Sequence, residues 1–183
     1  MTYRPIEIVD TWEDWAVQEN PPRFRRGTKA GDLGRWSNFN GLEVKVALVR
    51  APNYDPSFKV AIGCSEDVYQ LMLPTLVDEV VESFFVLVMN TRHRVIGIHQ
   101  VARGTITNVS IHPSDILRVV LAAGAIAFIL VHNHPSGDAE PSNDDMAVTK
   151  RAKEAADIIG LQLLDHVVIA PGTFVSFADR GQL

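Results

Sequence analysis

The stretch VHNHPSGDAEPSNDD, residues 131–145, constrains this chain more than any other part of the sequence. It follows the apolar run AIAFILV, whose length and composition predict a buried β-strand. Residues two apart on an extended chain point to the same side, so His132 and His134 direct two imidazoles at one point. Open sheets present ligand-binding side chains at the C-terminal ends of their strands. The stretch therefore predicts two protein ligands of a metal ion.

Asp145 is the candidate third ligand. Ser142 is a preferred N-cap residue, which places Asp145 at the third position of the following helix. The intervening loop contains Pro, Ser and Gly, and it can fold this helix start back over the two histidines. Two histidines and a carboxylate, with a fourth position left for water, are typical of a catalytic zinc ion. The alternative is that Ser142 and Asp145 form only a helix cap, because S-x-x-D is close to the capping-box pattern.

The composition excludes several other kinds of protein. A single cysteine, Cys64, rules out a disulfide framework and metal sites built from several thiolates, including zinc fingers and zinc deaminases. A net charge of −5 argues against a protein that coats nucleic acid through many basic contacts with phosphate. The sequence has no apolar stretch of about 20 residues, and its N-terminus lacks the basic and apolar regions of a signal peptide. We therefore expect a cytoplasmic protein without a membrane segment.

The chain divides into three regions by pattern. Residues 1–40 contain all three tryptophans and many turn formers without helical or alternating periodicity, which indicates an irregular N-terminal arm. Residues 41–60 form a connecting strand region, and residues 61–183 form a regular domain in which strand and helix patterns interleave. This interleaving predicts the α/β class with a mixed sheet.

The expected elements of the domain follow from apolar runs, caps and turns. Strands are expected at 84–90, 95–105 and 125–131, and in a last hairpin, 161–170 with 173–177, that turns at Pro171 and Gly172. Helices are expected from an N-cap at Ser65 to near Val81 with an interruption at Pro74, from Pro113 to Gly124, and from 143 to Gly160.

The motif places the chain near a known family. The pattern H-x-H-x7-S-x2-D, formed by His132, His134, Ser142 and Asp145, resembles the motif of the JAMM (MPN) metalloproteases. The text HNHPSGDAEPSNDD, with RVIGIHQVARGT and LLDHVVI, resembles the RadC-like branch, whose members carry a JAB domain, over about residues 61–181. The resemblance implies a mixed, curved β-sheet flanked by helices, in a cytidine-deaminase-like architecture. It also implies one Zn²⁺ per chain, bound by His132, His134 and Asp145.

The resemblance further implies the chemistry. Members of the family hydrolyse an amide, peptide or isopeptide bond with a zinc-activated water, and a glutamate ahead of the first apolar strand is the general acid and base. The matching text VESFFVLVMN makes Glu82 this residue, with Glu79 as the competing assignment. The hydroxyl of Ser142 is placed by the resemblance to donate to the developing oxyanion.

Other polar residues near the motif have less definite roles. Metal-bound imidazoles normally donate their second N–H to a carboxylate or carbonyl, for which Asp138, Asp144 and backbone carbonyls are candidates. His166 is a candidate for a further metal ligand. The alternative, which is the more usual one for a histidine, is a packed or surface side chain.

Two alternatives to a hydrolase follow from the same resemblance. RadC proteins usually begin with a helix-hairpin-helix domain, and residues 1–60 lack this pattern. A DNA-repair-associated or nucleic-acid accessory protein would instead use the basic segment with Arg23, Arg25 and Arg26, although such a run is usually a solvated loop. A non-catalytic MPN interaction module is the other alternative. The substrate, a peptide or protein, is not identified by the sequence, and an exposed edge strand would permit a homodimer.

Overall fold

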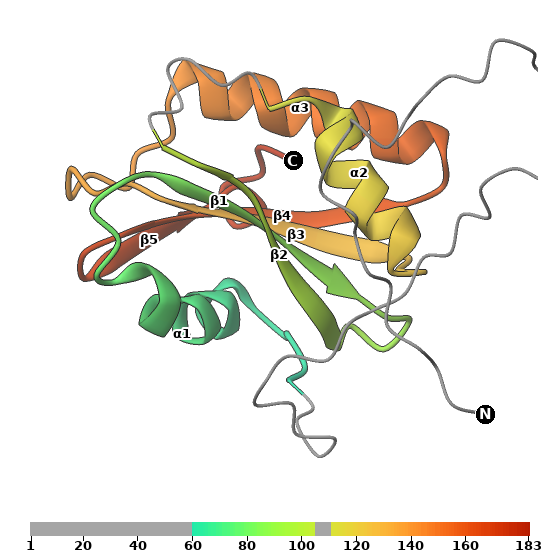
Figure 1. The fold of residues 1–183 in the computed structure, drawn as a ribbon, viewed down its shortest axis with the longest axis horizontal. Helices are drawn as coiled ribbons and strands as arrows, with labels where there is room; N and C mark the ends of the chain where they lie inside the picture. Colours follow the sequence, from blue (N-terminus) through green and yellow to red (C-terminus); the bar gives the residue numbers. More distant parts are fainter. Residues whose placement is uncertain (1–59, 105–110) are drawn as a thin grey trace, which may run out of the picture. The chain divides into compact units, whose positions relative to one another are not determined.

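The computed structural model describes residues 60–104 and 111–183, so the predicted arm at 1–40 and nearly all of the connecting region at 41–60 lie outside the described residues. The described part contains three helices and five strands (Figure 1). In chain order they are α1 (Ser65–Leu76), β1 (Ser83–Met89), β2 (Val95–Arg103), α2 (Pro113–Ala122), β3 (Ala127–Asn133), α3 (Asn143–Ile158), β4 (Gln162–Ala170) and β5 (Thr173–Ser176).

The five strands form one mixed sheet in the order β2-β1-β3-β4-β5. Neighbouring strands are antiparallel except β3 and β4, which are parallel and are joined through α3. Helix α1 covers one face of the sheet, and α2 and α3 cover the other (Figure 1). The predicted α/β class, with a mixed sheet flanked by helices, is confirmed.

The central strands are buried on both faces. Every residue of β1 and β3 is buried, as their continuous apolar runs predict. Successive side chains point to opposite faces, so Phe84, Val86 and Val88 contribute to the core beneath α2 and α3. Phe85 and Leu87 contribute to the core beneath α1. The sheet is therefore a rigid layer between two apolar cores.

The first helix differs from its expected bounds at both ends. Its N-cap is Cys64 rather than Ser65, because the Asp67 carboxylate accepts the backbone N–H groups of Gly63 and Cys64, at 2.7 and 3.1 Å, and so fixes the cap one residue earlier. The helix ends at Leu76 and not near Val81. Pro74 lies in its last turn, where its missing N–H removes one helical hydrogen bond to the preceding turn.

The other elements agree with the expectations to within a few residues. Pro113 is the first residue of α2, and Ser142 is the N-cap of α3. Gly124 and Gly160 follow the two helices with φ of 62° and 75°, values that glycine adopts without steric cost. Strand β3 begins two residues later than expected and includes His132, since the apolar run continues as extended chain into the histidine pair.

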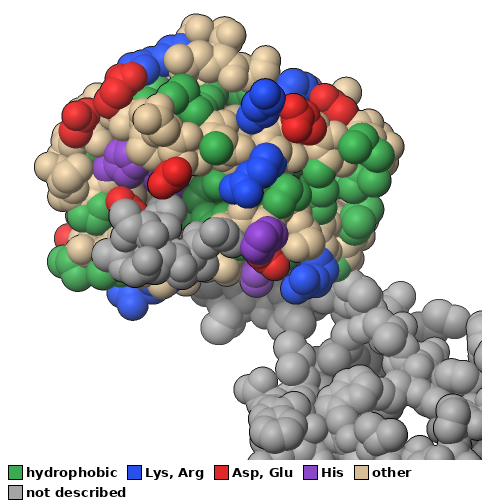
Figure 2. Space-filling view, turned by 90° about the horizontal axis from the view of Figure 1, so that it is seen from above, with side chains coloured by type: hydrophobic (Ala, Val, Ile, Leu, Met, Phe, Trp, Pro, Cys, Tyr) green, Lys and Arg blue, Asp and Glu red, His purple; other side chains and the backbone are tan. Residues whose placement is uncertain are grey.

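Charged side chains of both signs are interspersed on the face shown in Figure 2, and hydrophobic side chains gather at one side of it. Among the described residues, no helix is both long enough and apolar enough to cross a lipid bilayer.

Leu130 tests the packing of the central strand. It is fully buried in β3, so Leu130→Ala should lower the free energy of unfolding by about 3 kcal/mol through lost apolar burial and the cavity left behind. Ile158, which is 85% exposed at the end of α3, is the control, and Ile158→Ala should change the stability by less than about 0.5 kcal/mol. Urea unfolding measures both, and equal effects would contradict the assigned core.

Candidate metal centre

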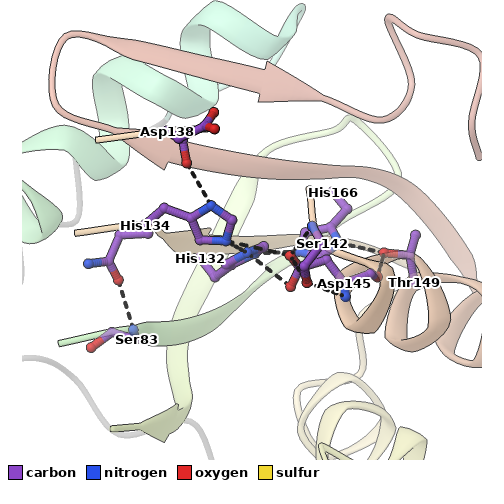
Figure 3. Close-up of polar contacts among 9 residues, drawn as sticks. Ser83, His132, His134, Asp138, Ser142, Asp145, Thr149 and His166 are labelled. Atoms are coloured by element: carbon purple, nitrogen blue, oxygen red, sulfur yellow. Dashed lines mark hydrogen bonds and ion pairs between the residues drawn. The ribbon is translucent and has the colours of Figure 1, made fainter. Parts of the chain in front are cut away.

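Two adjoining elements carry the three predicted ligands. His132 is the penultimate residue of β3, and His134 follows the strand directly. The backbone N–H of His134 donates to the carbonyl of Ile169 in β4 at 2.7 Å, which holds the start of the loop against the sheet. Asp145 is the third residue of α3, and the loop returns the helix start to the end of β3 (Figure 3).

The three side chains converge on one point. The Nε2 atoms of His132 and His134 are 3.0 Å apart. Oδ1 of Asp145 is 3.1 Å from Nε2 of His132, and Oδ2 is 3.5 Å from Nε2 of His134. His132 is fully buried and Asp145 is 4% exposed. Within residues 60–104 and 111–183, this is the only group of three such side chains arranged to hold a metal ion.

Each imidazole turns its Nε2 atom toward this point because its other nitrogen is bonded elsewhere. Nδ1 of His134 lies 2.8 Å from the backbone carbonyl of Asp138 (Figure 3). A carbonyl only accepts, so the proton of His134 is on Nδ1 and the Nε2 lone pair faces the cluster. Nδ1 of His132 lies 2.8 Å from His166. The second partner of His134 is thus the Asp138 carbonyl and not its carboxylate.

Ser142 and Asp145 form the helix cap, and the cap itself orients the carboxylate. The backbone N–H and the hydroxyl of Ser142 both donate to Asp145 Oδ2, at 2.8 and 2.6 Å. The backbone N–H of Asp145 donates in return to Ser142 Oγ at 3.1 Å. With Oδ2 held by the cap, Oδ1 points to His132. The cap therefore does not exclude Asp145 as a metal ligand, since it leaves Oδ1 directed at His132.

The Asp145 carboxylate and the His134 imidazole shift each other's pKa. Burial raises the pKa of Asp145, but hydrogen bonds with His132, His134 and Ser142 lower it by more, so this pKa lies well below its usual range. The hydrogen bond with Asp145 raises the pKa of His134, against the opposing effect of burial, and the charge of Glu82 adds to the increase. Burial lowers the pKa of His166, which keeps that ring neutral. The cluster is a negatively charged, largely buried site that attracts a cation.

The two candidate glutamates have different surroundings. Glu79 forms an ion pair with Arg103, whose Nη2 and Nε atoms lie 3.0 and 3.2 Å from its Oε2 atom. Glu82 precedes β1, is half-buried and acts electrostatically on His134. Its carbonyl accepts the N–H of Gly104 at 2.8 Å. Gly104 has φ of 128°, a value that favours glycine.

Asn133 is a site residue that the sequence reasoning missed. As the residue between the two histidines it points to the other side, where its Oδ1 accepts the backbone N–H of Ser83 at 2.7 Å. Its Nδ2 donates to the carbonyl of Val81 at 3.1 Å. Asn133 therefore fixes the chain on both sides of Glu82. The strand alternation was the available signal, because it places the middle residue of H-x-H on the opposite face of the sheet from His132.

A groove of about 430 Å³ opens beside His134. Its walls are mostly apolar and come from the end of α1, the residues that follow it, the loop after β3 and the turn between β4 and β5. The apolar lining residues are Leu73, Leu76, Val77, Val80, Pro135, Ile169, Ala170 and Pro171. The groove gives a bound molecule direct access to the edge of the histidine cluster.

The chain matches the family described as RadC-like JAB domain over residues 62–182. It is 40% identical over 143 residues to a UPF0758 protein of Desulforamulus reducens, which is 76% of this chain and 63% of the relative. It is 43% identical over 123 residues to one of Thioalkalivibrio sulfidiphilus, 67% of this chain and 55% of the relative. A third UPF0758 protein, of Nitrosococcus oceani, is 46% identical over 102 residues, which are 56% of this chain and 46% of the relative. The aligned part is therefore about half to three fifths of the length of these relatives, and their names state no activity.

The affinity for zinc should depend on pH through His134. A proton on its Nε2 atom competes with a metal, and the pKa of His134 is raised above the ordinary 6.5. Zinc affinity should therefore be constant above this raised pKa and fall about tenfold for each pH unit below it, if one proton is displaced. Competition with a chelator, corrected for the chelator's own protonation, measures this between pH 8 and 5.5. A constant affinity over that range would contradict the assignment.

Proposed function

This chain belongs to the RadC-like JAB domain family, and from this membership and its histidine cluster we propose that it is a zinc-dependent metallohydrolase that cleaves an amide, peptide or isopeptide bond. The proposed metal ligands are His132, His134 and Asp145. A zinc ion bound there supplies a Lewis acid that activates water and polarises a carbonyl oxygen.

One observation carries the proposal: two imidazole nitrogens and a carboxylate oxygen converge within about 3 Å of one another in a buried position. When neither Nε2 atom carries a proton, the lone pairs of two neutral imidazoles and a negative carboxylate repel each other at these distances. A divalent cation with nitrogen and oxygen ligands removes the repulsion. Two His and one carboxylate are a ligand set that zinc enzymes use for catalysis.

Glu82 is the proposed general acid and base. Its carboxylate acts on His134, and its backbone is held by Gly104 on one side and by Asn133 through Ser83 on the other. From this position it accepts the proton of the attacking water and returns it to the leaving amine. Glu79 is a weaker candidate because Arg103 already engages its carboxylate.

Ser142 is the proposed donor to the developing oxyanion. Its hydroxyl is exposed at the start of α3 and donates to Asp145 Oδ2 at 2.6 Å. Rotation about its Cα–Cβ bond redirects the hydroxyl toward a substrate oxygen, while the backbone N–H of Ser142 continues to hold Asp145. A donor of this kind contributes roughly 3 kcal/mol to lowering the barrier.

The groove supports a peptide or protein as substrate. Its apolar walls, including Val77 and Val80, accept side chains next to a bond that lies at His134. An interaction module without catalysis remains the second candidate for this family, and it predicts zinc binding without turnover or no zinc binding. The nucleic-acid alternative depends on Arg23, Arg25 and Arg26, which lie outside the described residues.

Glu82→Gln should abolish hydrolysis without removing the metal. We expect the zinc-loaded variant to lose at least about 100-fold in kcat on a fluorogenic peptide library, because the general base is gone while the ligands are intact. Glu79→Gln is the matched control, and its kcat should stay within about threefold of the wild type, since only an exposed ion pair is lost.

The outcomes separate the candidates. Full activity of Glu82→Gln, or loss only in Glu79→Gln, would overturn the assignment of the base. A zinc-loaded wild type that cleaves no amide in the library would favour the interaction module.

A further inference from the structure

His166 is a fully buried titratable residue that the proposed reaction does not use. It lies in β4 directly behind His132, on the side away from the cluster (Figure 3). Its ring stacks on Phe177, with centroids 4.9 Å apart, and meets the edge of Phe84 at 5.4 Å. Packing alone would be satisfied by an apolar side chain. Both ring nitrogens of His166 nevertheless have polar partners, His132 and Thr149.

The partners determine where the protons are. The backbone carbonyl of Asp145 only accepts, so the Thr149 hydroxyl, 2.6 Å away, donates its single proton there. The 2.6 Å contact between Thr149 Oγ1 and His166 Nδ1 therefore requires a proton on Nδ1. A neutral imidazole has only one N–H, so Nε2 of His166 accepts. Its partner at 2.8 Å, Nδ1 of His132, must donate.

We propose that His166 and Thr149 are positioning residues that hold His132 in the Nδ1-protonated tautomer, leaving the Nε2 lone pair for the metal. This inference rests on the proposed function and adds to it the device that prepares one ligand. The chain of hydrogen bonds runs from His132 through His166 and Thr149 to the backbone carbonyl of Asp145, so it begins at one ligand and ends at another.

The fold places His166 behind His132 through an irregularity in the sheet. The register between β3 and β4 pairs Phe128 with Leu163 but Ile129 with Asp165, so β4 has one extra residue at this point. Leu130 is consequently opposite His166, which puts His166 on the same face as His132. Without the extra residue, His166 would lie opposite Val131 and point to the face covered by α1.

Asp165 and the C-terminal segment hold this irregular strand. The Asp165 carboxylate accepts the backbone N–H groups of His166 and Ala178, at 2.7 and 2.9 Å, and the hydroxyl of Ser176 at 2.6 Å. The carbonyl of His166 accepts the N–H of Phe177 at 3.0 Å. The position of the ring is thus fixed from the backbone as well as from its two nitrogens.

The partner of His132 is an uncharged imidazole, unlike the carboxylates that often support metal-bound histidines. A carboxylate there would draw the Nδ1 proton away and increase the negative charge on the ligand. His166 supplies the same orientation without adding charge. The three proposed ligands therefore carry only one negative charge, that of Asp145.

Thr149 allows a test that leaves the ligands untouched. Thr149→Val has nearly the same shape but no hydroxyl, and Thr149→Ser keeps the hydroxyl. Competition with a chelator at pH 8 should show about tenfold weaker zinc binding for Thr149→Val, and binding within about threefold of the wild type for Thr149→Ser. Unfolding of both variants in the presence of EDTA shows whether the fold is kept without metal.

A second measurement needs neither a variant nor a metal. Histidine ring nitrogen NMR on the zinc-free wild type at pH 8 should show His166 protonated at Nδ1 and unprotonated at Nε2. In Thr149→Val a part of the population should move its proton to Nε2.

The possible results are distinct. A wild-type His166 with its proton on Nε2, or equal zinc affinity of Thr149→Val and the wild type, would overturn the role of the pair while leaving the proposed function in place. A wild type that binds no zinc would instead contradict the proposed function, and with it the role of His166 and Thr149 in preparing His132 for a metal.

Discussion

The carboxylate of Asp145 joins the fold to the candidate site. One oxygen holds the start of α3 through Ser142, and the other faces the buried nitrogen of His132. A carboxylate that is 4% exposed needs compensation for its lost hydration, and the cap provides two hydrogen bonds to it. Because the same group ends the loop and faces the metal position, the helix start cannot move without disturbing the cluster. The candidate metal site is therefore part of the fold and not an addition to its surface.

The sheet determines which side chains can reach that carboxylate. Alternation in β3 sends His132 to the α3 side and Asn133 to the α1 side, so one strand end positions both a proposed ligand and the segment that carries Glu82. The extra residue in β4 adds His166 to the α3 side. Both effects follow from the two-residue period of a strand, which converts a shift of one residue into a change of face.

Much of this arrangement could be predicted from the sequence, because the residues that form it lie close together along the chain. Ten residues lie between His134 and Asp145, and the strand end, the loop and the cap lie within one continuous stretch. The contact of His132 with His166 could not be predicted in this way, since it joins residues 34 apart through a register that the apolar pattern does not specify. The end of α1 at Leu76 was missed because the apolar spacing continues past Leu76 although the helix does not.

The central claim is that His132, His134 and Asp145 hold one metal ion, and the most direct test is the metal content of the chain purified without a histidine tag and then supplied with zinc. The account predicts about one zinc per chain for the wild type and for His99→Ala, a change at an exposed histidine in β2, and almost none for the double variant His134→Ala with Asp145→Asn. A folded wild type that takes up no zinc, or a double variant that retains it, would contradict the account.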